Sequence, residues 1–280
     1  MNPNNVVITG STRGIGLAFA IKFLELGDNV VISSRNRNLV DRITQVLQKK
    51  HSNRIVGTVA DVTKFEDVKH LGEFALSKFG DLDIWINNAG ISPSSLKVFH
   101  ELEPEKIHDT ITTNLLGTLY GSKVALSIMK EKGGKIYNME GLGARGRVQK
   151  GMTVYGTTKA AIPYVRKALS YEYKETDVII CSIQPGMVVT NILTGEAGTT
   201  YDKRVYWVFN LLSDTAENVA EKLVPMMKQN SKRNARLNYS SSMKTLWKFL
   251  TPWRYTNRYF DEEGNLKVQK IEDKILQNAK

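Results

Sequence analysis

The strongest constraint on the fold is the segment from Val6 to Gly16, which reads Val-Val-Ile-Thr-Gly-Ser-Thr-Arg-Gly-Ile-Gly. Its first three residues are apolar and β-branched, as in a short buried strand of a parallel sheet. Three glycines follow at the spacing G-x-x-x-G-x-G, and residues 17–26 continue with helical periodicity. Such a strand, turn and helix start make a phosphate cradle, because backbone can approach an anion there and the helix start offers free N–H groups. A tight turn without a ligand is the alternative.

Apolar runs of strand length alternate with stretches of helical periodicity over the first two thirds of the chain. We expect strands at residues 6–8, 29–34, 55–59, 82–86, 133–139 and 178–183, and helices at 17–26, 39–50, 68–79, 104–130 and 153–173. This alternation predicts a doubly wound parallel α/β sheet of the Rossmann type. The 280 residues suffice for one large domain or two small ones, and an apolar content of 41% supports a sizeable core.

The end of the second expected strand indicates which dinucleotide the cradle would bind. An acidic residue there would bind the ribose 2′-hydroxyl of NAD, but the sequence has Arg35 at this point. A second arginine, Arg13, lies in the glycine turn. Two guanidinium groups beside one ribose favour a 2′-phosphate through charge and bidentate hydrogen bonds, so we predict a preference for NADP(H). The alternative is that both arginines are solvated loop cations.

A tyrosine and a lysine four residues apart form a candidate acid–base pair. Tyr155 and Lys159 would lie on one helical face, one turn apart. A phenol with a pKa of about 10 is a poor acid–base group at neutral pH. An adjacent ammonium stabilises the phenolate, so we expect Lys159 to lower the pKa of Tyr155. Lys159 would also hold the hydroxyls of the nicotinamide ribose.

Four motifs, in this order, resemble those of the short-chain dehydrogenase/reductase family. They are T-G-x-x-x-G-I-G at residues 9–16, N-N-A-G at 87–90, Y-x-x-x-K at 155–159 and P-G-x-x-x-T at 185–190. The resemblance implies an NADP-binding Rossmann-type catalytic domain at 1–200 and a substrate-covering extension of the same domain at 201–280. The residues that it implies for cofactor binding are Thr9, Gly10, Ser11, Arg13, Gly14, Ile15, Gly16, Arg35, Asp61, Val62, Asn88, Ala89, Gly90, Tyr155, Lys159, Pro185, Gly186, Val188 and Thr190.

Some of these roles compete with structural ones. By the resemblance, Asp61 meets the adenine ring, but aspartate also suits a helix or turn cap. Asn114, within the expected long helix, would bend that helix and hold a water in the proton path, as a third catalytic residue beside Tyr155 and Lys159. An exposed helix asparagine is the alternative. Backbone near Val188 and the hydroxyl of Thr190 would hold the nicotinamide carboxamide.

The sequence departs from the family pattern where a serine normally binds the substrate carbonyl. The stretch 138–144 reads Asn-Met-Glu-Gly-Leu-Gly-Ala and has no serine or threonine. Glu140 is our tentative substrate residue, although it could donate a hydrogen bond only if protonated or through water. It could instead anchor loop N–H groups. The segment 137–141, with 83–90 and 185–188, resembles the chlorophyll b reductases, as do 219–225 and the region from 244 to 259.

The charge of the chain is concentrated in its last fifth. The formal net charge is +11, and residues 228–258 hold eight lysines and arginines but no acidic residue. Tyr239, Trp247, Phe249, Trp253 and Tyr255 are interleaved with them. A packed extension with a solvated basic face, contact with a membrane or pigment–protein complex, and, least favoured, nucleic-acid binding are the three interpretations. Residues 194–206 fall where the family places a substrate-covering loop, and 272–280 form a charged helix or a frayed end.

The composition predicts a free thiol and no metal site. The sole cysteine, Cys181, lies in an apolar run and should be buried, and the four histidines show no metal-ligand spacing. No run of eighteen apolar residues indicates a membrane-spanning helix. The first strand begins too early for a leader. We therefore expect a cytoplasmic protein, or a plastid or thylakoid-associated one if a presequence has been removed.

The resemblance implies NADPH-dependent reduction of the C7 formyl group of chlorophyll(ide) b to hydroxymethyl. Tyr155 would protonate the developing alkoxide while hydride reaches the carbon. A general carbonyl reductase of a small ketone, sterol or 3-oxoacyl substrate is the second interpretation, and a non-catalytic NADPH-binding scaffold is the third. The family commonly pairs through the helices expected at 104–130 and 153–173, so a homodimer or homotetramer is expected.

Overall fold

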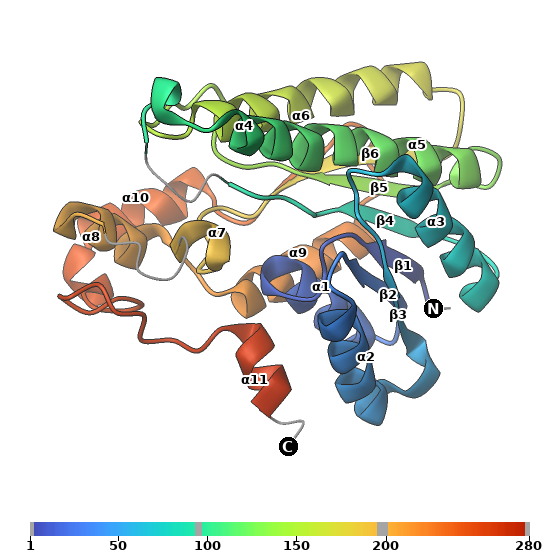
Figure 1. The fold of residues 1–280 in the computed structure, drawn as a ribbon, viewed down its shortest axis with the longest axis horizontal. Helices are drawn as coiled ribbons and strands as arrows, with labels where there is room; N and C mark the ends of the chain where they lie inside the picture. The colour runs from blue at the N-terminus through green and yellow to red at the C-terminus, as the bar shows by residue number, and fades with distance from the viewer. Residues whose placement is uncertain (1–2, 93–96, 195–200, 278–280) are drawn as a thin grey trace.

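Seven parallel strands form one sheet in the computed structural model, which describes residues 3–92, 97–194 and 201–277. The strand order is β3-β2-β1-β4-β5-β6-β7 (Figure 1). This confirms the predicted doubly wound α/β architecture, and β7 adds an edge strand that the sequence pattern did not reveal. The strands are β1 (Asn5–Ile8), β2 (Asn29–Ser34), β3 (Ile55–Val59), β4 (Ile84–Asn87), β5 (Gly134–Met139), β6 (Val178–Gln184) and β7 (Arg236–Asn238).

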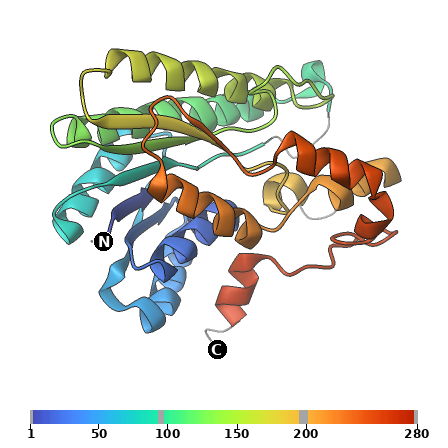
Figure 2. The same cartoon turned by 180° about the vertical axis from the view of Figure 1, so that it is seen from behind.

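Helices cover both faces of the sheet, as Figures 1 and 2 show. One layer contains α1, α2 and α9, and the other contains α3, α5 and α6. A hydrophobic core lies on each face of the sheet. Val6 and Ile8 of β1 pack into the core on the first side, and Val7 packs into the core on the second side. The helices are α1 (Gly14–Glu25), α2 (Arg37–His51), α3 (Phe65–Phe79), α4 (Pro104–Ile111), α5 (Gly117–Met129), α6 (Thr153–Glu172), α7 (Asn191–Thr194), α8 (Lys203–Leu212), α9 (Ala216–Gln229), α10 (Ser242–Leu250) and α11 (Ile271–Gln277).

The chain changes direction across the sheet at β1. Val6 of β1 pairs with Val30 of β2 on one side and with Ile84 of β4 on the other. The connections on the two sides therefore run away from each other and leave a crevice at the carboxyl ends of β1 and β4. Ligands of doubly wound sheets bind in this crevice. The glycine turn predicted from the sequence follows β1 directly, so it lies at this point.

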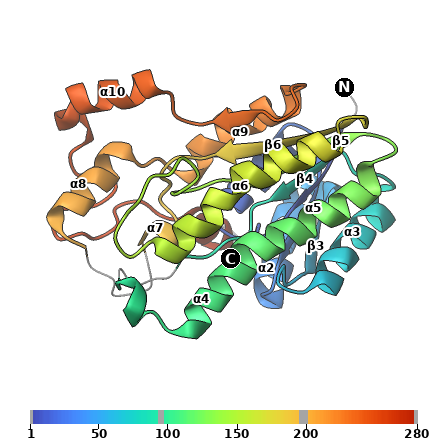
Figure 3. The ribbon, with the colours of Figure 1, turned by 90° about the horizontal axis from the view of Figure 1, so that it is seen from above.

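The helix expected at residues 104–130 is not a regular α-helix throughout. A π-helical turn at Thr112–Leu116 separates α4 from α5 in the long rod that Figure 3 shows. Asn114 lies in this turn with no exposed surface, so the alternative of an exposed helix asparagine is wrong. Its side chain bonds the backbone N–H and carbonyl of Ile91, both at 2.8 Å, rather than solvent. Such inserted turns commonly mark functional sites.

The basic tail is partly a packed element of the fold. Lys228 forms a 2.5 Å ion pair with the buried Asp28, and Arg258 lies 3.5 Å from Asp214. Tyr239 is buried, whereas Trp247 and Trp253 are 58% and 71% exposed. These contacts account for some of the positive charge without an external partner. Within the expected covering segment 194–206, residues 195–200 lie outside the described residues, and so do 278–280 of the expected end helix.

Two glycine-to-alanine substitutions should change stability in opposite directions. A Cβ on Gly121 of α5 would lie 1.9 Å from Oδ1 of Asn87, which is buried and accepts a hydrogen bond from Trp85. Gly121→Ala should therefore lower the free energy of unfolding by about 1–3 kcal/mol through overpacking. A Cβ on Gly156 of α6 meets nothing within 4 Å, so Gly156→Ala should raise it by about 0.5–1 kcal/mol. Urea unfolding measures both, and equal effects would contradict the packing described.

Candidate active site

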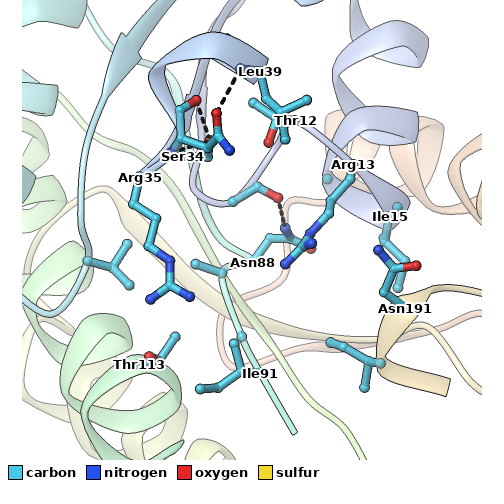
Figure 4. Close-up of a pocket in the computed structure, with 18 of the residues that line it drawn as sticks. Thr12, Arg13, Ile15, Ser34, Arg35, Leu39, Asn88, Ile91, Thr113 and Asn191 are labelled. Carbon is cyan, nitrogen blue, oxygen red and sulfur yellow. Dashed lines mark hydrogen bonds between the residues drawn. The ribbon is translucent and has the colours of Figure 1, made fainter. Parts of the chain in front are cut away.

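A cleft of about 340 Å³ opens at the carboxyl ends of β1, β2 and β4 (Figure 4). It is lined by the β1–α1 turn, by the ends of β2 and β3, by the loop after β4, and by residues of α7 and α11. The structure therefore brings twelve of the nineteen predicted cofactor residues to one place. Those that line the cleft are Gly10, Arg13, Gly14, Ile15, Gly16, Arg35, Asp61, Val62, Asn88, Ala89, Gly90 and Thr190.

The floor of the cleft is bare backbone because side chains do not fit there. Gly10 has a φ of +61°, and a Cβ on it would lie 2.8 Å from the Cα of Ala89. A Cβ on Gly16 would lie 2.6 Å from the carbonyl oxygen of Gly10. The turn after β1 is thereby pressed against the loop after β4, and α1 starts with its N–H groups at the cleft. This arrangement fits a phosphate-bearing ligand.

Thr9 and Ser11 support the cradle from behind instead of lining it. The hydroxyl of Thr9 accepts hydrogen bonds from the backbone N–H groups of Asn88 and Ala89, at 3.0 and 3.1 Å. The hydroxyl of Ser11 donates to the carbonyl of Ile8 at 2.6 Å. Both side chains are buried. Their side chains therefore do not reach the cleft, as the predicted contact with the cofactor would require, and instead hold the two loops in shape.

Two arginines from different loops face the same open space. Arg13 and Arg35 are exposed, line the cleft, and extend their guanidinium groups into it from opposite sides in Figure 4. Within the described residues, neither forms an ion pair with an acidic side chain. Ser34 ends β2 and Arg35 follows it, at the point where an NAD site would have an acidic residue. This environment fits a ribose 2′-phosphate. Asp61 lines the cleft nearby and also caps its own turn, accepting hydrogen bonds from Thr63.

The predicted acid–base residues converge beside the cleft. Tyr155 and Lys159 of α6 are 8% and 3% exposed, and Nζ of Lys159 lies 5.8 Å from the centre of the Tyr155 ring. A Cβ on Gly90 would lie 3.6 Å from Nζ of Lys159 and 3.3 Å from Oδ1 of Asn114. Two of the three predicted catalytic side chains, Asn114 and Lys159, thus meet at Gly90, and Tyr155 lies beside Lys159.

The electrostatics of this pair differ from the prediction. Burial raises the pKa of Tyr155 to about 12, and burial lowers the pKa of Lys159 to about 8. The expected lowering of the Tyr155 pKa by Lys159 is absent, because both groups lose hydration and the ammonium donates to the carbonyl of Met139 at 3.1 Å. A phenol with a raised pKa stays protonated at neutral pH. It is therefore a proton donor, as reduction of a carbonyl requires.

Gly141, in the segment that lacks the family's serine, packs closely against Tyr155 and Lys159. A Cβ on Gly141 would lie 2.4 Å from the hydroxyl oxygen of Tyr155 and 3.1 Å from Cγ of Lys159. Any side chain at position 141 would collide with the tyrosine in this arrangement. The absence of a serine or threonine at position 141 thus has a steric reason here.

Glu140 is committed to the fold. Its carboxylate is buried, accepts hydrogen bonds from Ser182 at 2.6 Å, and forms a 2.5 Å ion pair with Arg236 of β7. Arg166 lies 4.0 Å away. The geometry does not support hydrogen-bond donation to a substrate, because the carboxylate accepts from two partners and does not line the cleft. It is an anchor, as the second interpretation held, but for side chains of β6 and β7 rather than for loop N–H groups.

The last motif reaches the cleft only through Thr190. A Cβ on Gly14 would contact Cγ2 of Thr190 at 3.2 Å, so this threonine borders the phosphate cradle. Val188 is buried and pairs with Asp214. Pro185, Gly186 and Val188, together with Tyr155 and Lys159, lie outside the set of residues that line the cleft. The lining residues that the sequence analysis missed are Thr12, Ser34, Asn36, Leu39, Ala60, Ile91, Thr113, Asn191, Ile192 and Glu272.

Most of the missed residues are sequence neighbours of predicted ones, so position next to a motif was an available signal. Glu272 is different, since it lies 258 residues from Gly14 and belongs to no motif. Cys181 is a buried free thiol, as predicted. The described residues contain no cluster of three or more His, Cys, Asp or Glu side chains suited to a metal ion. Among them, no helix is both long and apolar enough to cross a membrane.

The sequence profile of the short chain dehydrogenase family matches residues 4–199. The chain belongs to this family. It is accordingly an oxidoreductase that acts on CH–OH or carbonyl groups. The curated protein "Probable chlorophyll(ide) b reductase NYC1, chloroplastic" of Oryza sativa subsp. japonica is 36% identical over 291 residues, covering 98% of this chain. This chain spans 57% of that relative's length.

A second relative has more of its length in common with this dehydrogenase. "Chlorophyll(ide) b reductase NOL, chloroplastic" of Arabidopsis thaliana is 37% identical over 255 residues, with 89% of this chain and 70% of the relative covered. Among solved structures, "ElxO with NADP Bound" is 28% identical and has a TM-score of 0.74, covering 85% of this chain and 97% of that chain. A 3-ketoacyl-(acyl-carrier-protein) reductase from Brucella melitensis, 24% identical, shares the fold with a TM-score of 0.75, covering 86% and 98%.

Removal of the arginine that neutralises Glu140 should destabilise this dehydrogenase. Arg236→Met leaves a buried carboxylate without its main partner, so we expect the free energy of unfolding to fall by about 3 kcal/mol. The double variant Glu140→Met with Arg236→Met should recover most of that loss, because the buried carboxylate is then removed together with its main cation, while Arg166 keeps its hydrogen bond to Ser182. Arg254→Met, at an exposed arginine of the same tail, is the control and should change stability by less than about 0.5 kcal/mol. Full stability of Arg236→Met alone would contradict the anchor role.

Proposed function

We propose that this dehydrogenase reduces the C7 formyl group of chlorophyll(ide) b to a hydroxymethyl group with NADPH. The observation that carries the substrate is the near full-length similarity to proteins named chlorophyll(ide) b reductase, at 34–38% identity. The family carries the reaction class, carbonyl reduction. The two cleft arginines, the glycine floor and the NADP in a related structure support the cofactor.

The residues of this chain divide the work between binding and proton transfer. The β1–α1 turn and the start of α1 hold the phosphates, and Arg13 and Arg35 hold the 2′-phosphate. When bound, NADPH supplies the hydride that reduces the formyl carbon. Tyr155 donates its phenolic proton to the oxygen that becomes the alcohol, since its raised pKa keeps it protonated. The buried Lys159 ammonium then stabilises the phenolate, and the π turn at Asn114 holds the water that returns the proton.

Loss of the phenol should abolish turnover without loss of cofactor. In anaerobic incubation with NADPH and chlorophyllide b, followed by absorbance and chromatography, wild type should yield the 7-hydroxymethyl product. Tyr155→Phe should lower kcat by about 10²–10⁴-fold, because one proton donor is lost, while the NADPH dissociation constant stays within about threefold. Tyr164→Phe, at a 75% exposed tyrosine of the same helix, should behave as wild type. Unchanged turnover in Tyr155→Phe would refute the proposed role.

The phosphate assignment has its own test. Arg35→Asp removes a charge-assisted contact to the 2′-phosphate and adds repulsion, so NADPH binding should weaken by about 10–100-fold. NADH lacks that phosphate, and its affinity should change by less than about threefold. Arg37→Asp, at an exposed arginine two residues away that does not line the cleft, is the matched control. Equal losses for both nucleotides would refute the 2′-phosphate contact.

A second candidate is reduction of a smaller carbonyl compound. It is favoured by the likeness in fold to reductases with other substrates, such as the 3-ketoacyl-(acyl-carrier-protein) reductase. The incubation above separates the two. Oxidation of NADPH by a small reactive aldehyde, without conversion of chlorophyllide b, would support this second candidate. NADPH binding without reduction of any carbonyl would favour a non-catalytic scaffold.

A further inference from the structure

The C-terminal helix α11 packs against the amino-terminal part of the fold and borders the cofactor cleft. Helix α11 packs against α1 and α2, far from its neighbours in the chain (Figure 1). Its first residue, Ile271, is 6% exposed and joins the core that contains α1 and α9. Lys274 forms a 2.6 Å ion pair with Glu217 of α9, and Lys270 donates a hydrogen bond to Asn191 of α7. Helix α11 is thus held in place by apolar, ionic and hydrogen-bond contacts.

This anchoring places a carboxylate on the phosphate cradle. Oε2 of Glu272 accepts a hydrogen bond from the backbone N–H of Gly14 at 3.0 Å, and Glu272 lines the cleft. Gly14 is the first residue of α1, which has no acidic residue in its first turn and no side-chain cap from Arg13. A helix start in this condition attracts an anion. Glu272 provides one from 258 residues away.

A carboxylate and a phosphate cannot use the same N–H group at the same time. The start of α1 is the part of the cleft that the proposed function assigns to the cofactor phosphates. Glu272 therefore stands where a phosphate oxygen would bind, and its negative charge repels the cofactor. The ion pair that α11 forms within the described residues involves Lys274, which contacts Glu217, so it does not neutralise Glu272.

From this geometry we infer that Glu272 is an internal competitor of the cofactor, and that α11 sets the affinity of the cleft for dinucleotide phosphates. The inference rests on the proposed cofactor but not on the proposed carbonyl substrate. Cofactor binding must move the carboxylate away from Gly14. Any change that loosens α11 from Glu217 of α9, which does not line the cleft, then raises cofactor affinity.

The test compares two neighbouring acidic residues of the same helix. Glu272→Gln keeps the size of the side chain and removes its charge. Asp273→Asn is the matched control, because Asp273 borders a separate hollow with Arg42 and not the cleft. Calorimetric titration of the full chain should give NADPH binding about three- to tenfold tighter in Glu272→Gln and within twofold of wild type in Asp273→Asn.

Smaller probes locate the effect within the cleft. ADP carries a pyrophosphate and should gain affinity in Glu272→Gln by about the same factor as NADPH. The fragment 2′-AMP carries a ribose phosphate but no pyrophosphate, so its affinity should change by less than about twofold. An equal gain for 2′-AMP would overturn competition at Gly14 and indicate a general charge effect.

The remaining outcomes each decide the matter. Unchanged NADPH affinity in Glu272→Gln would overturn the inference and leave Glu272 as a helix cap only. Weaker binding would also overturn it, because Glu272 would then be a contact that favours the cofactor. If wild type and both variants all failed to bind NADPH, the proposed cofactor itself would be refuted, and the inference with it.

Discussion

The close approach of two backbone segments, the turn after β1 and the loop after β4, is the contact on which the site depends. Gly10 and Gly16 permit this approach, because a Cβ on Gly10 would overlap the backbone of Ala89 and a Cβ on Gly16 would overlap the side chain of Asn88. The hydroxyl of Thr9 then fixes the spacing by accepting hydrogen bonds from Asn88 and Ala89. The same approach brings the loop at 88–91 near α6, so that Asn114 and Lys159 both face Gly90. The proposed phosphate cradle and the predicted acid–base residues therefore share one structural origin.

Local patterns were sufficient to predict the architecture and most of the cleft. The turn at 9–16, the loop at 87–90 and the pair Tyr155 and Lys159 could be found because each needs particular residue types at fixed spacing. The order of strands and helices then placed them at one edge of the sheet. The sequence did not reveal what depends on contacts between distant segments. Strand β7 has three residues, too few for a periodic signal, and Glu140 pairs with Arg236, 96 residues away.

The pKa values of Tyr155 and Lys159 also depend on more than the local sequence pattern. From the sequence, a lysine one turn from a tyrosine implies a lowered phenol pKa. In the folded protein the loss of hydration is the larger effect, and it moves the pKa of Tyr155 upward and that of Lys159 downward. Burial depends on everything packed around the pair, including Gly141, and no local motif contains that information. A bend at Asn114 was predicted, but its form, a π turn, was not, because the side chain of Asn114 is held there by the peptide of the distant Ile91.

The long-range ion pairs also bear on the order in which the molecule can be completed during synthesis. Asp28 lies in the first turn between helix and strand, yet its cation partner, Lys228, follows 200 residues later. Glu140 similarly has its cation partner, Arg236, 96 residues further along the chain. While the ribosome is still making the last fifth of the chain, the emerged part of the sheet holds two acidic groups that cannot yet be buried without cost. The packing around Asp28 and Glu140 is therefore complete only once Lys228 and Arg236 are part of the folded chain.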